Sequence, residues 1–214
     1  MLKSIKQATG EQFIDGSGKQ ILSRPVAELV YKNGLIYDYD TDNIQNVGGY
    51  CKTMYNYTTG GLGDLVQNTV ASQPLIVPNF IGSKKALLGG SFSTTINLSA
   101  YTVFMVINTG SNAFAGLTIN GANVFGTPYG NYSGGSSATY YRNNLYVASG
   151  NLSASQNVVL CVYCTWSKNF NVTYNGGTSM YLMAIKIYNR YVNAYERRDI
   201  NTALGSAFSI AMEA

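Results

Sequence analysis

Apolar residues dominate several short stretches of this chain, and the clearest of them is residues 180–188. On an extended chain, one face would carry Met180, Leu182 and Ala184, and the other Tyr181, Met183, Ile185 and Ile187. Because a strand with two apolar faces is typical of one buried between two layers, we expect a core strand here. It should end sharply at Asn189-Arg190.

A short helix is predicted directly after this strand. Asn193 is suited to the N-cap position, and Glu196 lies three residues later, where a capping box needs it. An apolar edge follows at Ile200, Ala203 and Leu204. Gly205 is the residue expected to end the helix.

Two upstream stretches, residues 101–108 and 157–164, are also apolar on both faces and predict buried strands. Residues 114–125 predict a hairpin that turns at Asn120-Gly121, because Asn-Gly suits a two-residue turn. Short strands joined by tight turns are typical of an all-β protein.

A turn is predicted before the strand at 180–188. Residues 170–174 alternate between apolar and polar positions, so one of their faces should be wet. Asn175-Gly176-Gly177 should then turn the chain. Together these strands and turns fit a jelly-roll β-sandwich with one short C-terminal helix.

The segment 180–204, with its "IYNR" strand end and "ER" helix, resembles the close of the concanavalin-A-like lectin/glucanase superfamily, in its laminin-G-like branch. Residues 34–44 resemble the opening strand and acidic turn of that branch, and residues 64–74 its "ATQ…QP" segment. The resemblance implies a concanavalin-A-like sandwich over residues 31–214. A fold by itself does not give a function.

Residues 1–30 differ from the rest, since they show no long periodic pattern and are interrupted at Gly16-Ser17-Gly18. We interpret them as an N-terminal arm that anchors the chain, through contacts with other virion proteins or in a homo-oligomer. The alternative is that they complete an edge of the sandwich.

Composition changes the picture in one respect. Charged residues make up only 11% of the chain, against about 25% in an average domain, and polarity comes instead from Gly, Asn and Tyr. The net charge of +4 forms no basic stripe, so nucleic-acid binding is not expected. No apolar run approaches membrane length, so membrane insertion is not expected either.

The side chains that most hydrolases need are scarce. The chain has no histidine, and no Asp or Glu lies between Asp64 and Glu196. Glycoside hydrolysis ordinarily needs two carboxylates across the scissile bond, and the glucanases of the resembled superfamily carry theirs on a central strand. We therefore expect no enzyme activity.

Asp38, Asp40 and Asp42 have the D-x-D-x-D spacing of a calcium loop. The match ends there, because position six is Asn43 and position twelve is Gly49, which offers no carboxylate. Solvated turn carboxylates are the preferred interpretation, calcium is a weak candidate, and no other cofactor or metal is expected.

Ligand-binding candidates are aromatic. The Gly- and Ser-rich segment 127–141 is interpreted as a loop too polar to be core, and Trp166 follows a predicted core strand. Rigid aromatic side chains beside small polar ones suit a binding surface. The candidates for a host surface glycan are Tyr129, Tyr132, Tyr140, Tyr141 and Trp166. The alternative is that they pack the sandwich or contact neighbouring subunits.

The cysteines bear on where the protein works. We interpret Cys51, Cys161 and Cys164 as buried free thiols, with Cys161 and Cys164 on opposite faces of one strand. No export signal is visible at the start of the sequence. A chain made in a reducing cytoplasm that nevertheless resembles a surface lectin would suit a bacteriophage.

The leading functional hypothesis is therefore a non-enzymatic bacteriophage virion structural or adhesion protein, such as a head decoration, fibre or tail-tip component. Its sandwich would face the host, and its location would be the virion, after synthesis in the host cytoplasm. The alternative is a free-standing bacterial carbohydrate-binding module at the cell surface.

Overall fold

The computed structural model describes the backbone of residues 3–7, 10–14, 20–24, 33–58, 63–98, 101–109, 116–119, 122–126, 138–147, 156–164 and 168–213. Side chains are described for residues 33–58, 63–92, 102–108, 139–146, 156–163 and 180–213. Statements about contacts below refer to these residues.

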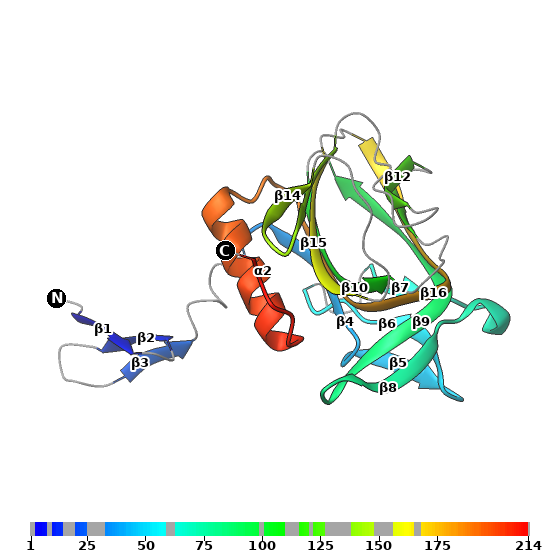
Figure 1. Cartoon of the computed structure of the whole chain (residues 1–214), viewed down its shortest axis with the longest axis horizontal. Coiled ribbons are helices and arrows are strands. Elements are labelled where there is room, and N and C mark those ends of the chain that lie inside the picture. The colour runs from blue at the N-terminus through cyan, green and yellow to red at the C-terminus, as the bar shows by residue number, and fades with distance from the viewer. Residues whose placement is uncertain are drawn as a thin grey trace.

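The predicted all-β class with one short C-terminal helix is confirmed (Figure 1). The first strands are β1 (Lys3–Gln7), β2 (Gly10–Ile14), β3 (Gln20–Arg24), β4 (Leu35–Asp40), β5 (Ile44–Val47), β6 (Tyr50–Met54), β7 (Leu65–Val66) and β8 (Leu75–Ile81). The later strands are β9 (Lys84–Leu98), β10 (Tyr101–Thr109), β11 (Gly116–Ile119), β12 (Ala122–Gly126), β13 (Ala138–Arg142), β14 (Leu145–Val147), β15 (Asn157–Cys164) and β16 (Lys168–Tyr188). A 3-10 turn (Val70–Ser72) and helix α2 (Ala194–Ala207) complete the described elements.

Strand β16 is the element around which the larger sheet is assembled (Figure 1). It pairs antiparallel with β10, β4, β9 and β11 along different parts of its length. In the order β14-β13-β15-β10-β16-β9-β7-β6-β5, β10 lies next to β16 and β15 lies on the far side of β10. The predicted end of this strand at Asn189-Arg190 is confirmed.

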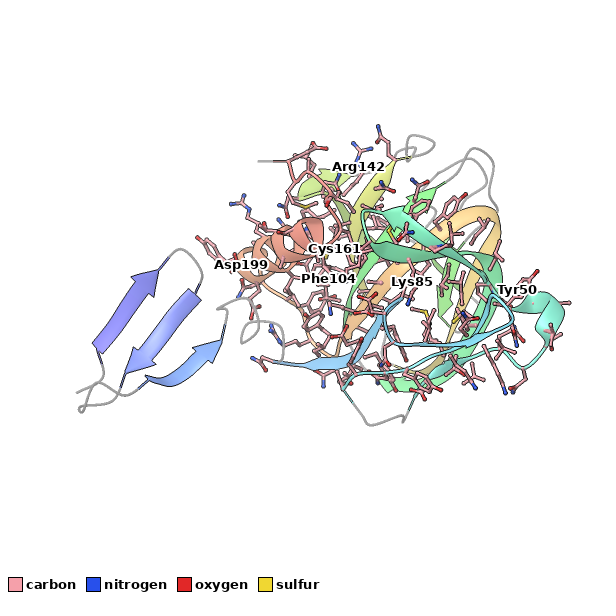
Figure 2. All side chains as sticks on the ribbon, turned by 90° about the horizontal axis from the view of Figure 1, so that it is seen from below. Tyr50, Lys85, Phe104, Arg142, Cys161 and Asp199 are labelled. Atoms are coloured by element: carbon pink, nitrogen blue, oxygen red, sulfur yellow. The ribbon has the colours of Figure 1, made fainter. Side chains whose placement is uncertain are left out.

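The core lies on both faces of the layer formed by β15, β10 and the end of β16. On β10, Val103, Met105 and Ile107 join a cluster shared with β4, β6 and β7. Its alternate residues Phe104 and Val106 join a second cluster, which helix α2 covers. Figure 2 shows Phe104 beside Cys161 under this helix. Burial on both faces agrees with the predicted jelly-roll sandwich.

The face assignment predicted for residues 180–188 is wrong in its second half. Met180 and Leu182 belong to the first cluster as expected, but Ile185 and Ile187 join them there, while Ala184 lies on the opposite face. The cause is a bulge, because Val106 is opposite Ala184 and Ile107 is opposite Leu182, which leaves Met183 as an extra residue. An extra residue exchanges the two faces for everything that follows it.

The turn predicted at Asn175-Gly176-Gly177 is also wrong, since β16 continues through it. Residues on both sides stay paired with β9, and the register shifts between Asn175 and Gly177 and again before Tyr181. On β9 the opposite residue is Gly90, which has φ +67°, and a Cβ there would lie 2.4 Å from the backbone nitrogen of Pro74. The Gly and Asn residues here form β-bulges in two paired strands and do not form a turn that reverses the chain.

Other strand predictions are confirmed. Residues Thr102 to Asn108 of β10 are all buried, and Val158 to Val162 of β15 are too. Strands β11 and β12 pair with Ile119 opposite Ala122, as a hairpin turning at residues 120 and 121 requires. Cys51 and Cys161 are buried and form no disulfide, as predicted. The side chain of Cys164 lies outside the described residues.

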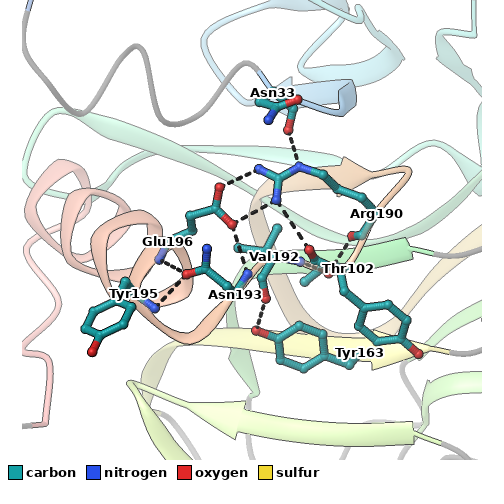
Figure 3. Close-up of polar contacts among 9 residues, drawn as sticks. Asn33, Thr102, Tyr163, Arg190, Val192, Asn193, Tyr195 and Glu196 are labelled. Atoms are coloured by element: carbon teal, nitrogen blue, oxygen red, sulfur yellow. Dashed lines mark hydrogen bonds and ion pairs between the residues drawn. The ribbon is translucent and has the colours of Figure 1, made fainter.

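Helix α2 begins as predicted, and Figure 3 shows the polar network that fixes its start. The Asn193 side chain accepts hydrogen bonds from the N–H groups of Tyr195 and Glu196, and the Glu196 carboxylate accepts one from the N–H of Asn193. Arg190 donates to both carboxylate oxygens of Glu196 at 2.8 Å. Strand end and helix start are thus held by one fork of charge-assisted bonds.

The helix does not end at Gly205, contrary to prediction. It continues to Ala207, with Phe208 as C-cap, and Gly205 is a buried helical residue. A Cβ on Gly205 would lie 2.7 Å from the carbonyl oxygen of Ile210 and 2.7 Å from Met212. Glycine is present because the C-terminal segment returns closely over the helix.

The first strands form a sheet of their own, in the order β1-β2-β3. All pairs are antiparallel, with Ser4 opposite Phe13 and Phe13 opposite Leu22. The sequence showed no long periodicity here, and three five-residue strands are too short to produce one. Within the described ranges, no helix has the length and hydropathy needed to cross a membrane.

Replacing Gly205 by alanine tests the close approach of the C-terminal segment. In an open helix this change would stabilise by about 1 kcal/mol, but the contact with Ile210 should reverse the sign and destabilise by about 1–3 kcal/mol. Urea unfolding measures the difference, with exposed Ser206→Ala as the matched control. A stabilised Gly205→Ala variant would contradict this packing.

Replacing Glu196 by glutamine tests the Arg190–Glu196 pair. The bond to Arg190 lowers the pKa of Glu196 in the folded protein. The pair therefore stabilises the fold fully at a pH above the ordinary pKa of a glutamate. This stabilisation is lost as the pH falls through the lowered pKa of the folded state. Because the side chains are partly exposed, we expect a cost of about 1 kcal/mol or less at about pH 7. The cost should shrink toward about pH 3, measured by urea unfolding at both. An equal cost at both would show that the charge is immaterial.

Candidate functional site

A pocket of about 740 Å³ lies between strand β4, the end of β16 and the last turns of helix α2. We call it the β4–α2 groove. Its walls combine charged, aromatic and small apolar side chains, and its lining residues are Leu35, Asp38, Asp40, Tyr57, Thr58, Lys84, Ala184, Lys186, Ala203, Leu204, Ala207 and Phe208.

Alternation along β4 puts its carboxylates into the groove. Tyr39 is fully buried in the first core cluster, and its hydroxyl donates to the carbonyl of Gly63. Its neighbours Asp38 and Asp40 therefore share the other face of the strand. In the sequence Tyr-Asp-Tyr-Asp at 37–40, the two tyrosines therefore point to the core and the two aspartates point to the groove.

Lysines neutralise two of the three neighbouring carboxylates. Lys186 is directly opposite Asp38 in the β16–β4 register and donates to it. Lys84 donates to Asp42, and this bond raises the pKa of Lys84. The bulge at Met183 makes the first pair possible, because without it Lys186 would face the first core cluster with Met180 and Leu182.

Asp40 lies between these two pairs and opposite Ala184, which has no charge to offer. Its Oδ1 accepts the N–H of Asp42 at 2.8 Å and the hydroxyl of Tyr57 at 3.3 Å. Burial raises the pKa of Asp40, and the nearby carboxylates of Asp42 and Asp38 add to the increase. Of the three acids, Asp40 is the one that no described lysine contacts.

Tyr57 is positioned by the turn that follows β6. Its N–H donates to the carbonyl of Asp38 at 3.0 Å, and Asn56 ties the same turn to Asp64 through a 2.8 Å bond. The side chain is nevertheless 53% exposed, so its ring remains available at the groove. Burial, followed by the charge of Asp40, raises the pKa of Tyr57 to about 12, which keeps the hydroxyl a donor.

Helix α2 supplies the opposite wall. Ala203 and Ala207 are small and leave space, while Leu204 and Phe208 are buried in the second core cluster. The groove therefore has one polar, charged wall and one apolar wall. Such a surface can hold a ligand that has both hydroxyl groups and an apolar face.

Of the predicted calcium candidates, Asp38 and Asp40 line this groove and Asp42 lies next to it, and two of the three are occupied by lysines. Asp38 bonds Lys186 and Asp42 bonds Lys84. In the part of the chain that the structure describes, no three His, Cys, Asp or Glu side chains converge as metal ligands would. Calcium binding here stays a prediction.

The predicted aromatic candidates separate. Tyr140 is a core residue, 5% exposed in the first cluster, so it offers no binding surface. The expected loop to Tyr141 is wrong at its end, because strand β13 begins at Ala138 and pairs with β15. Tyr129, Tyr132 and Trp166 lie outside the described residues.

Tyr141 belongs to a row of four tyrosine rings that crosses the surface beside helix α2. The rings of Tyr146, Tyr141, Tyr163 and Tyr191 follow one another with centroids 5.7–5.8 Å apart. The guanidinium of Arg197 lies 3.6 Å from the Tyr141 ring centroid. Because Tyr163 also donates to the carbonyl of Val192 at 2.7 Å, the row fastens the helix to the sheet.

Sequence reasoning missed three groove residues, Tyr57, Lys84 and Lys186. Lys186 had a signal, since it is the one charged residue in the apolar stretch 180–188. A charge in a buried strand needs a partner or a change of face. Tyr57 and Lys84 carry no such signal in the sequence. Each follows a turn, and only the tertiary structure determines that this turn brings the side chain to the groove.

No protein-family model matches the chain, and no curated protein matches it. Among solved structures, it is similar to a carbohydrate-binding module (CBM6cm-2) from Cellvibrio mixtus lichenase 5A in complex with cellotriose. The identity is 12%, the match covers 73% of this chain and 99% of that chain, and the TM-score is 0.25. The fold described above follows from the strand pairing, independently of this low score.

Proposed function

We propose that this chain is a non-enzymatic, carbohydrate-binding β-sandwich protein that holds its ligand in the β4–α2 groove. The observation that carries the proposal is the combination of an exposed tyrosine ring with fixed charged groups around one pocket of about 740 Å³. Sugars present apolar ring faces and hydroxyl edges, and this groove offers a counterpart to each.

The distribution of acids supports binding over hydrolysis. Asp38 and Asp40 are on one face of a single strand, whereas the wall opposite them is formed by Ala203, Ala207 and other apolar side chains. A glycosidase needs carboxyl groups on both sides of the scissile bond, or one poised on each side of the ring. The groove could hold a sugar but lacks that arrangement.

Replacing Tyr57 by alanine should weaken glycan binding by about tenfold, as the loss of one ring contact worth about 1.4 kcal/mol would do. A glycan array identifies a ligand for the wild-type chain, and titration calorimetry then gives the affinities. Tyr50→Ala is the matched control, because Tyr50 is 41% exposed and Figure 2 places it far from helix α2.

Two results would contradict the assignment of this site. One is an absence of glycan binding by the wild-type protein. The other is an equal loss of affinity in Tyr50→Ala and Tyr57→Ala, which would show that the groove is not where the sugar is held.

We further propose that residues 1–30 anchor the chain in a bacteriophage virion, as the adhesion hypothesis requires. Strands β1–β3 form their own sheet, and no described strand pairs it with the larger one. A sheet of three strands needs a hydrophobic face or a packed partner element to be stable, and a partner in the virion could cover such a face. Cys51 and Cys161, which are buried and form no disulfide, suit synthesis in a reducing cytoplasm.

Deleting residues 1–30 should convert a defined oligomer into a monomer whose circular dichroism and thermal unfolding stay those of a folded sheet. Light scattering on both chains gives the solution mass. If the full chain is already a monomer and deletion changes nothing, the free-standing bacterial carbohydrate-binding module at the cell surface becomes the better account.

A further inference from the structure

The charged side chains at the β4–α2 groove leave one acid without an ion pair. Asp38, Asp40, Lys84 and Lys186 line the groove, whereas Asp42 lies outside its lining and donates its N–H to Asp40. Each lysine is committed to one acid, Lys186 to Asp38 and Lys84 to Asp42. One negative charge is left over, and it belongs to Asp40.

Asp40 is held ready to accept a further donor. Its Oδ1 takes the N–H of Asp42 and the hydroxyl of Tyr57, and no described group donates to its Oδ2. The strand neighbour opposite is Ala184, whose methyl group leaves the space in front of the carboxylate to the groove. A ligand is therefore the natural source of the missing counter-charge.

Helix α2 adds to the negative field. Its last turns line the groove at Ala203, Ala207 and Phe208, and no basic residue lies in its last turn. The C-terminal end of a helix carries a partial negative charge and favours cations nearby. The Nζ of Lys84 lies 5.9 Å from the Phe208 ring centroid. Its positive charge therefore compensates part of this negative potential, although Lys84 is also bonded to Asp42.

We propose that the groove selects a cationic sugar, a glycan with free amino groups such as a glucosamine oligosaccharide. The ammonium group would donate to the carboxylate of Asp40, and the apolar face of the sugar ring would lie on Tyr57. This inference rests on the proposed carbohydrate-binding function and names the ligand class for it. A charge-assisted hydrogen bond is about twice as strong as a neutral one, so the amino group should dominate the selection.

The environment of Asp40 agrees with this assignment. Burial raises its pKa and the carboxylates of Asp42 and Asp38 add to the increase, while the N–H of Asp42 and the charge of Lys186 offset only part of it. The ionised form of Asp40 is therefore less stabilised than it would be in water. An ammonium group at hydrogen-bonding distance would supply the missing stabilisation of the Asp40 carboxylate. A neutral N-acetylated sugar of the same length would fill the same space and leave the carboxylate uncompensated.

Titration calorimetry with two matched ligands tests the proposal. Wild-type protein is titrated with a glucosamine tetramer and with its N-acetylated counterpart at about pH 6, where a free amine is protonated. We expect the amino form to bind about tenfold more tightly. Asp40→Asn should remove that preference, because the affinity for the amino form should fall about tenfold relative to that for the N-acetylated form. Glu213→Gln removes an exposed carboxylate outside the groove and should keep the wild-type preference.

The outcomes separate the two proposals. Equal affinities in the wild type, or an equal loss for both ligands in Asp40→Asn, would overturn the cationic-sugar inference while leaving carbohydrate binding in place. Binding of neither ligand, nor of any glycan, would overturn the proposed function itself. If calcium alone binds with one site per chain and Asp40→Asn abolishes it, the leftover charge belongs to a metal and the inference is wrong.

Discussion

The antiparallel pairing of strand β16 with four others is the constraint on which the rest of this structure depends. Its first half is paired with β9 and β11, and its second half with β10 and β4, so strands distant in the chain are joined through it. Both core clusters include its side chains. Every backbone group of such a buried strand must find a partner, which ties the whole sheet to one register.

The bulge at Met183 links that register to the groove. It moves Ile185 and Ile187 to the first core cluster and turns Ala184 and Lys186 to the other face. Lys186 then meets Asp38, and Ala184 leaves space in front of Asp40. A one-residue irregularity in the central strand therefore creates both the ion pair and the opening beside it, because a shift of one residue exchanges faces.

Tyrosine serves several purposes here, which explains why its abundance alone says little about binding. Tyr39 and Tyr140 are core residues, and the row that includes Tyr141 and Tyr163 holds helix α2 to the sheet. Tyr57 is the member that reaches the groove with its ring exposed. An aromatic ring with a polar tip suits each of these places, so burial and partners must be known before a role is assigned.

The sequence by itself determined the all-β class, the strands β10 and β15, the pairing of β11 with β12 and the capping box of helix α2. Each depends on local patterning or on bonds between residues a few positions apart. Only the tertiary structure decided the bulges of β16, the helical place of Gly205 and the joining of Asp40, Tyr57 and Lys84. These three features depend on which distant strand or segment packs against a given residue. The local sequence around each residue does not indicate that contact, because the partners are far apart in the chain.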